Sequence, residues 1–211
     1  VWWSPDSRRI AVMRVDERQV PKLTVYSSTS TRPRPFTYPS AFPEDSITPV
    51  YETWVLDVER KTKQKVDRPL QQADVFGLTG ADMIQWSPAS DRLFLMEGER
   101  ANKSARVIEA DAGTGSARVV LVDSSRTFLE NASGVASGNW RVVGDKLLWW
   151  SERDGWGHFY RYALDGTLEG QVTRGDWLAE RIRWIDPVTK QLYFSALGRD
   201  PSHPHYVHLM R

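Results

Sequence analysis

Three histidines near the end of the chain have the residue type and the close spacing from which metal sites are built. His203, His205 and His208 form an H-x-H-x-x-H string, and imidazole nitrogens are common zinc ligands. On a strand, His203 and His205 would share a face while His208 points to the opposite one, because side chains alternate. We therefore expect these residues to flank the start of a strand, and the sequence predicts no metal site.

A second candidate for chemistry is the acid–base cluster Glu152, Arg153 and Asp154, which stands beside a run of aromatic residues. General acid–base catalysis needs titratable groups that reach one reacting atom. Consecutive residues leading into a turn point in different directions. We therefore expect a solvated turn, in which Arg153 forms at most an ion pair across the turn.

A third candidate is a basic run that consists of Arg60, Lys61, Lys63, Lys65 and Arg68. Nucleic-acid binding would need more positive charge around it, yet 28 basic and 27 acidic residues leave a net charge of only +1. We interpret the run as the solvated edge of a hairpin, where lysines oppose pairing with other strands. Neither nucleic acid nor an anionic membrane is predicted as a partner.

Composition limits the remaining classes of site. The chain has no cysteine, which excludes disulfides and thiolate metal ligands. Its apolar runs are too short to span a membrane. The sequons at 102–104 and 131–133 become glycosylation sites only on a eukaryotic secretory route. No catalytic residue and no cofactor site is predicted in the chain.

The elements that must position these residues repeat along the sequence. Residues 3–14 read WSPDSRRIAVMR and residues 86–97 read WSPASDRLFLME, and weaker copies begin at Trp140 and Trp184. Each copy continues into further short strands separated by turns, and the Asp-Gly pairs at 154–155 and 165–166 are typical of tight hairpins. Repeats of about 40–50 residues with about four short strands each are typical of β-propeller blades.

Apolar residues occupy both faces of several expected strands, as in RIAVMRV, RLFLM and KLLWW. Such strands must be covered on both sides, which neighbouring blades do. We therefore predict an all-β chain that forms part of a β-propeller, about four blades of a ring of about eight. The predicted units are 1–70, with an insertion at 15–50, then 71–124, 125–174 and 175–211.

The ends of this partial ring lead to two further expectations. The first unit is expected to lack its opening strand and the last its closing strand, as in a piece of a longer protein. An open half-ring exposes the apolar faces of its end blades, so we expect residues 1–211 alone to fold only marginally.

The insertion at 15–50 is the best candidate for an interaction element, because long loops in compact folds are often functional. Its segment 32–39, RPRPFTYP, is rich in proline and extended. A linear recognition motif is one interpretation. We favour a loop that packs on a neighbouring blade or on a partner subunit.

Several stretches resemble the N-terminal β-propeller of the dipeptidyl peptidase IV family, in the prolyl-oligopeptidase class of serine peptidases. They are WWSPDSRRIAVMRVDERQVP at 2–21, YPSAFPEDSITPVYETWVLDVE at 38–59, SERDGWGHFYRYALDG at 151–166 and VTRGDW at 172–177. The chain departs from the family pattern in the insertion. There, Tyr-Pro-Lys-Ala-Gly and Asn-Pro are replaced by YPSAF at 38–42 and by Thr48-Pro49.

The resemblance implies a parent enzyme that removes N-terminal dipeptides with Pro or Ala in second position. In the family, the catalytic serine stands on a G-x-S-x-G elbow of an α/β-hydrolase domain, followed by Asp and His. The chain contains no G-x-S-x-G, and the glutamate pair that holds the substrate's ammonium group would lie upstream of Trp2. The segment alone is therefore expected to be inactive.

The resemblance also implies the partners and the location. The implied partners are a peptide substrate, the hydrolase domain of the same protein and, as an option, a second copy of the protein. The implied location is the periplasm, the cell envelope or the outside of the cell after secretion. Two alternatives remain open: a non-enzymatic binding propeller, and a related tripeptidyl or acylaminoacyl peptidase.

Overall fold

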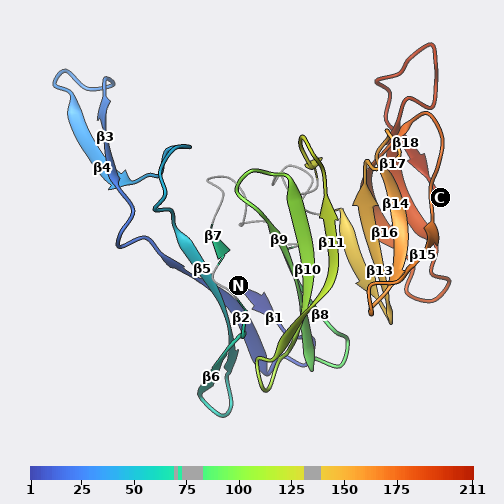
Figure 1. The fold of residues 1–211 in the computed structure, drawn as a ribbon, viewed down its shortest axis with the longest axis horizontal. Coiled ribbons are helices and arrows are strands. Elements are labelled where there is room, and N and C mark those ends of the chain that lie inside the picture. The colour runs from blue at the N-terminus through green and yellow to red at the C-terminus, as the bar shows by residue number, and fades with distance from the viewer. Residues whose placement is uncertain (69–70, 73–82, 131–138) are drawn as a thin grey trace.

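The computed structural model describes residues 1–68, 71–72, 83–130 and 139–211. Every named element in these ranges is a β-strand, which confirms the predicted all-β class. The strands form four antiparallel sheets, which follow one another along the chain and lie side by side, and one separate hairpin (Figure 1). No helix in the described ranges is long and apolar enough to cross a membrane.

The first sheet has the strand order β1 (Trp2–Trp3), β2 (Arg9–Asp16), β5 (Val50–Asp57), β6 (Thr62–Lys65), with β7 (Gln71–Gln72) also paired to β5. The expectation that this sheet lacks its opening strand is wrong. Trp2 pairs with Ala11 and Trp3 with Ile10, so β1 is a short opening strand.

The other three sheets are built from consecutive strands. The second contains β8 (Ile84–Trp86), β9 (Arg92–Gly98), β10 (Ser104–Asp111) and β11 (Ala117–Ser124). The third contains β12 (Trp140–Val143), β13 (Lys146–Ser151), β14 (His158–Ala163) and β15 (Leu168–Gln171). The fourth contains three described strands, β16 (Leu178–Ile185), β17 (Leu192–Leu197) and β18 (His208–Met210).

The antiparallel order decides which connections share an end of the molecule. After four antiparallel strands the chain is back at the end where the sheet began. The connection between the first and second strands therefore lies at the same end in every sheet, and so does each later connection. The tight-turn end carries residues 4–8, 58–61, 87–91, 112–116, 144–145, 164–167 and 186–191. The long-loop end carries residues 17–49, 99–103, 152–157, 172–177 and 198–207 (Figure 1).

The core lies between the sheets, as the apolar strand faces predict. In β13, Leu147 and Trp149 belong to a buried cluster shared with the second sheet. Leu148 and Trp150 of the same strand point the other way, into a cluster shared with the fourth sheet. All four are at most 8% exposed, and burial of each large apolar side chain stabilises the fold by about 2–3 kcal/mol.

The repeated Trp-Ser-Pro motif forms the same turn twice at the tight-turn end. Ser4 Oγ donates to Asp6 Oδ1 over 2.6 Å and accepts from the Arg9 backbone N–H at 2.9 Å. Ser87 Oγ likewise donates to Asp91 Oδ1 at 2.6 Å. In both copies the serine hydroxyl replaces a backbone partner, which explains why the motif needs serine after tryptophan.

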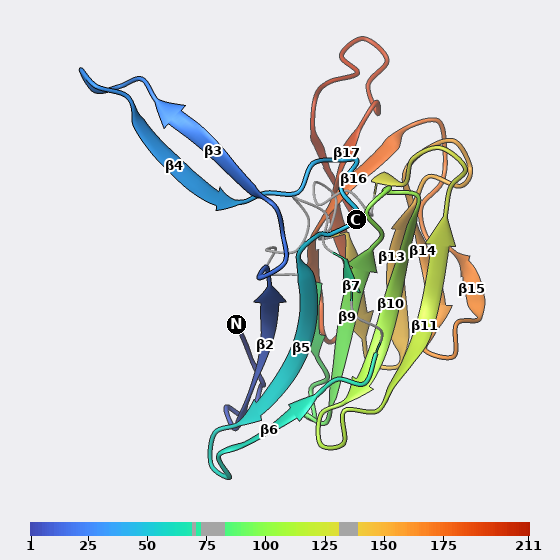
Figure 2. The same cartoon turned by 60° about the vertical axis from the view of Figure 1, so that its left-hand side comes forward.

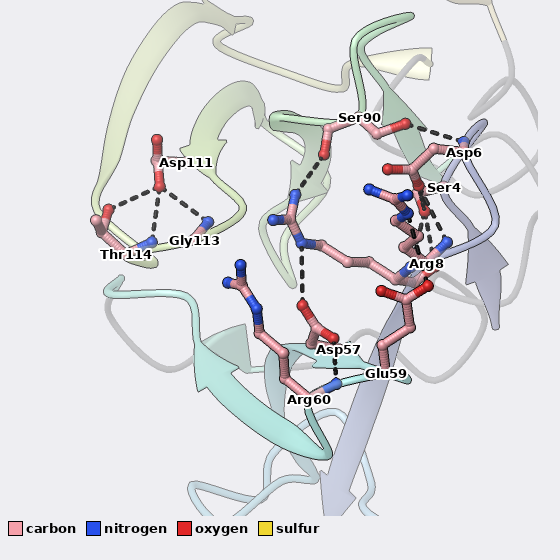
Figure 3. A network of polar contacts seen from close by, with 11 residues as sticks. Ser4, Asp6, Arg8, Asp57, Glu59, Arg60, Ser90, Asp111, Gly113 and Thr114 are labelled. Atoms are coloured by element: carbon pink, nitrogen blue, oxygen red, sulfur yellow. Dashed lines mark hydrogen bonds and ion pairs between the residues drawn. The ribbon is translucent and has the colours of Figure 1, made fainter.

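These two turns also bind the first sheet to the second (Figure 3). The Asp6 backbone N–H donates to Ser90 Oγ at 3.1 Å, and Arg9 Nη1 donates to the Ser90 carbonyl oxygen at 2.9 Å. Arg9 Nε also lies 3.8 Å from Asp57 Oδ2 of β5. The turns at this end therefore hold the first and second sheets together.

Side-chain amides join the first strands of neighbouring sheets. Gln85 of β8 donates to the Trp140 carbonyl oxygen at 3.1 Å and accepts from the Val142 N–H at 3.0 Å. Asn139, next to β12, bonds the backbone of β16 in the same two-sided way, with distances of 2.5 and 3.2 Å. Each amide thus imitates a β-bridge between two sheets.

The connection between β2 and β5 carries the separate hairpin, β3 (Lys22–Ser27) and β4 (Arg34–Pro39), which we call the arm. Its register runs from Lys22 opposite Pro39 to Ser27 opposite Arg34. The arm projects away from the four sheets in both views (Figures 1 and 2). The Pro-rich segment 32–39 is therefore mostly strand β4.

Candidate functional site

The turn at 152–157 lies at the long-loop end and contains the predicted acid–base cluster. Its residues 152–156 are exposed, as expected of a solvated turn. Their partners are not across the turn, however. Arg153 Nη2 lies 3.4 Å from Asp123 Oδ2 of β11, and its guanidinium covers the Tyr160 ring at 4.5 Å. Asp154 Oδ2 accepts a 2.5 Å hydrogen bond from the Tyr160 hydroxyl.

This network holds groups in place and has no free base. Burial raises the pKa of Tyr160, and the hydrogen bond to Asp154 raises it further, so the phenol stays protonated at neutral pH. Asp123 also accepts from Trp149 Nε1 at 2.8 Å. Arg153 and Asp154 thus both contact Tyr160, whereas Glu152 of the same turn lines a neighbouring cavity.

A cavity of about 300 Å³ opens beside this turn, between the third and fourth sheets. Burial raises the pKa of Glu152 in its lining, and the charge of Glu130 raises it further. Three carboxylates and one guanidinium line the cavity, which favours a cationic over an anionic occupant. The lining residues are Glu130, Asn139, Trp150, Glu152, Leu178, Glu180 and Arg181.

A second cavity, of about 360 Å³, lies at the base of the arm. Thr48 lines it and is 5% exposed, and its hydroxyl has no hydrogen-bond partner. Asp16 in the same lining is held by Arg18 through bonds of 2.9 and 2.6 Å. The lining residues are Asp16, Arg18, Gln19, Val20, Ile47, Thr48, Val50 and Glu52.

The basic run is not one continuous solvated edge. Arg60 and Lys61 lie in an exposed turn, whereas the Arg68 side chain is only 5% exposed and pairs with the 3% exposed Glu97. Arg106 Nε also bonds Glu97 at 2.7 Å. Burial, followed by the charge of Arg106, lowers the pKa of Arg68 to about 10. For Arg68 the prediction was wrong, because this residue joins the first sheet to the second.

The two remaining lysines of the run lie on β6. Lys65 Nζ bonds Glu52 Oε1 at 2.7 Å, and Lys63 Nζ lies 5.4 Å from the centre of the Trp54 ring. Both therefore contact the neighbouring strand β5 of the same sheet.

The three histidines of the H-x-H-x-x-H string flank the start of β18, as predicted. His203 stacks on Tyr206 at 4.6 Å, and its Nδ1 lies 3.4 Å from Asp200 Oδ2. His208 is in β18 opposite Ala196. Among the described residues, no group of three His, Cys, Asp or Glu side chains is placed to hold a metal ion.

The fourth histidine, His158, is only 2% exposed, and its neighbours in the sequence do not indicate a functional role. Its Nε2 donates to the Gly175 carbonyl oxygen at 2.9 Å, and its Nδ1 accepts from the Thr173 hydroxyl at 3.1 Å. Its ring meets Trp177 edge-on at 5.0 Å. The two stretches GHFY and VTRGDW thus form one buried contact around His158. The joint presence of these two stretches was the only feature of the sequence that pointed to this contact.

Of the two sequons, only the one at 102–104 lies within the described residues. Asn102 lies in the connection from β9 to β10 and has a positive φ of 52°, and Ser104 is the first residue of β10. Residues 131–133 lie outside the described residues.

Comparison with known proteins gives one family over nearly the whole chain. Residues 1–209 match the family model described as the dipeptidyl peptidase IV N-terminal region. Dipeptidyl peptidase 4 of Arthroderma otae is 24% identical over 204 residues, which cover 93% of this chain and 26% of that protein. Dipeptidyl peptidase 4 of Trichophyton rubrum is 23% identical, again over 93% of this chain and 26% of that protein.

Two solved structures share the fold. Porphyromonas gingivalis dipeptidyl peptidase 4 matches with a TM-score of 0.76 and 18% identity, over 98% of this chain and 28% of that one. The β-propeller domain of the Trilobed protease from Pyrococcus furiosus matches with a TM-score of 0.56 and 14% identity, over 98% and 52% of the two chains. The four sheets are therefore part of a β-propeller, as predicted. The chain spans about a quarter of the length of its curated relatives.

Proposed function

Because this chain belongs to the dipeptidyl peptidase IV N-terminal region family, we propose that it is the propeller segment of a serine exopeptidase. The full-length protein removes N-terminal dipeptides with Pro or Ala in second position. The relatives that match it are named dipeptidyl peptidase 4, which supports this reaction class.

The observation that carries the proposal is the unequal length of the connections at the two ends of the sheets. The tight-turn end has short turns that bond one sheet to the next. The long-loop end carries the arm connection at 17–49 and the loop at 198–207 (Figure 1). It also carries the cavity beside Glu152. Long connections on a rigid scaffold are where binding residues concentrate. We assign substrate gating and the contact with the hydrolase domain to this end.

The segment acts by position and contributes no bond-making group. A peptide held at a fixed distance from a nucleophile reacts faster because its orientation is already restricted. The sheets supply the required rigidity, since the large side chains of β13 are buried on both faces, in one cluster with the second sheet and another with the fourth.

The test is peptidase activity of the full-length protein. It is incubated with a chromogenic Gly-Pro substrate, with and without a covalent serine-directed inhibitor. We expect dipeptide release that the inhibitor abolishes. A well-folded full-length protein that releases nothing would refute the exopeptidase and favour a binding propeller. Release of tripeptides or acylated residues instead would identify the related peptidase classes.

For the partner of the arm we propose a second copy of the protein. Cross-strand pairs place Leu23 and Val25 on one face with Phe36 and Tyr38. Three of these are strongly exposed: Val25 by 39%, Phe36 by 54% and Tyr38 by 44%. An exposed apolar face of this kind indicates an interaction site.

Proline decides which edge of the arm a partner strand joins. Pro35 and Pro39 of β4 have no N–H, so they occupy positions whose N–H would point away from β3. The outer edge of β4 thus lacks two donors, whereas the outer edge of β3 retains its own. We therefore assign the dimer contact to β3.

Thr24 and Thr37 form a matched pair for the test, because they face each other and their hydroxyls bond at 2.8 Å. Thr24→Pro removes an outward donor from β3, and Thr37→Pro does the same on β4. We expect the first variant to shift the full-length protein toward monomer in sedimentation experiments and the second to remain dimeric. Equal behaviour of both variants, or a monomeric parent, would contradict the assignment.

A further inference from the structure

Trp156 is an exposed aromatic residue on a turn whose other residues are held in place. It stands between Gly155, whose N–H donates to the Glu152 carbonyl at 2.9 Å, and Gly157, whose carbonyl accepts from Ala179 at 2.9 Å. Gly157 also packs so closely that an added Cβ would lie 2.1 Å from the Trp150 ring. The turn therefore presents Trp156, which is 44% exposed, from a rigid base.

The neighbouring tryptophans all have partners within the propeller. Trp149 donates to Asp123, Trp150 donates to the Ala179 carbonyl at 2.6 Å, and Trp177 stacks on Phe194. Within the described ranges, the Trp156 ring has neither a hydrogen bond nor a ring contact. A rigid exposed tryptophan loses little conformational entropy on binding, which is why this residue type dominates binding hot spots.

We propose that Trp156 is a contact residue through which the propeller binds the catalytic domain of the full-length protein. This inference rests on the proposed function, which assigns the long-loop end to that domain. Trp156 is not among the residues that line the adjacent cavity, whereas Glu152 of the same turn is. The tryptophan thus stands outside the cavity, where a covering domain would contact it and a ligand inside the cavity would not.

The absence of cysteine from these 211 residues allows a direct test. In a cysteine-free background of the full-length protein, Trp156→Cys is compared with Val188→Cys. Val188 lies in the connection 186–191 of the tight-turn end and is 85% exposed. The rate of thiol alkylation is measured in the native protein and, for reference, in urea. We expect Cys alkylation at position 156 to be slowed at least ~10-fold in the native protein, and that at 188 to be nearly unchanged.

Equal native rates at the two positions would overturn the proposal. Protection at 156 that appears only after a peptide or an active-site inhibitor is added would also overturn it, because the contact would then belong to substrate. If the Trp156→Cys variant does not fold, the rate of hydroxyl-radical oxidation of Trp156 is measured in the unmodified protein. We expect slow oxidation of Trp156 in the native protein, and fast oxidation would overturn the proposal. The Gly-Pro assay is scored separately, so protection without activity would refute the exopeptidase and leave the domain contact standing.

Discussion

Replacing Asn139 by alanine tests whether side-chain amides hold neighbouring sheets together. Asn139 is 3% exposed, and it donates to the Glu180 carbonyl at 2.5 Å while accepting from the Ile182 N–H at 3.2 Å. The variant leaves two backbone groups at the β12–β16 junction without this partner. Each unsatisfied buried group costs about 1–2 kcal/mol, so we expect a loss of about 2–4 kcal/mol.

The assay is thermal unfolding of the full-length protein followed by tryptophan fluorescence. For a domain of this size the loss corresponds to a lower Tm by about 5–10 °C. Gln191→Ala is the matched control, because its amide makes only an exposed 3.2 Å hydrogen bond with Tyr193. We expect less than about 0.5 kcal/mol for the control.

Gln85→Ala removes the equivalent bridge between β8 and β12 and should have an effect of the same sign. It should be smaller, because Gln85 is only half-buried. If Asn139→Ala unfolds like the control, the amide bridges do not hold the sheets and apolar packing alone does.

Three further changes test other contacts. Gly115→Ala should destabilise the protein by at least about 2 kcal/mol in urea unfolding, since Gly115 has a φ of +76° and an added Cβ would lie 2.1 Å from the Lys65 carbonyl oxygen. Thr173→Val should cost about 1–3 kcal/mol in the same assay, because His158 Nδ1 loses its hydroxyl partner. The raised pKa of Tyr160 means that the unfolded phenol ionises first, so stability should fall as pH rises above about 10. Tyr160→Phe should flatten this fall in urea midpoints measured at pH 9 and pH 11.

Local patterns predicted the strands and their turns. The two-faced apolar run KLLWW became β13, with alternate residues in two clusters. Each Trp-Ser-Pro copy became a turn closed by its own serine, since Ser4 reaches Asp6 and Ser87 reaches Asp91 within a few residues. Such contacts depend only on neighbours in sequence, so a repeat is enough to recognise them.

The candidate site was predicted less well. The exposed residues 152–156 and the strand start after His203 agreed with expectation. The ion pair of Arg153 with Asp123 did not, because Asp123 belongs to another sheet. Nothing in the sequence near Arg153 indicates which strand of a neighbouring sheet will lie beside it.

The sequence by itself determined the all-β class, the repeated units and the long insertion that became the arm, because strand alternation and turn chemistry are local properties. Only the tertiary structure decided that Arg68 is buried against Glu97 and that His158 is a core residue with both nitrogens bonded. It alone also decided that the long connections share one end. Each of these depends on groups far apart in sequence that meet only after the sheets have packed.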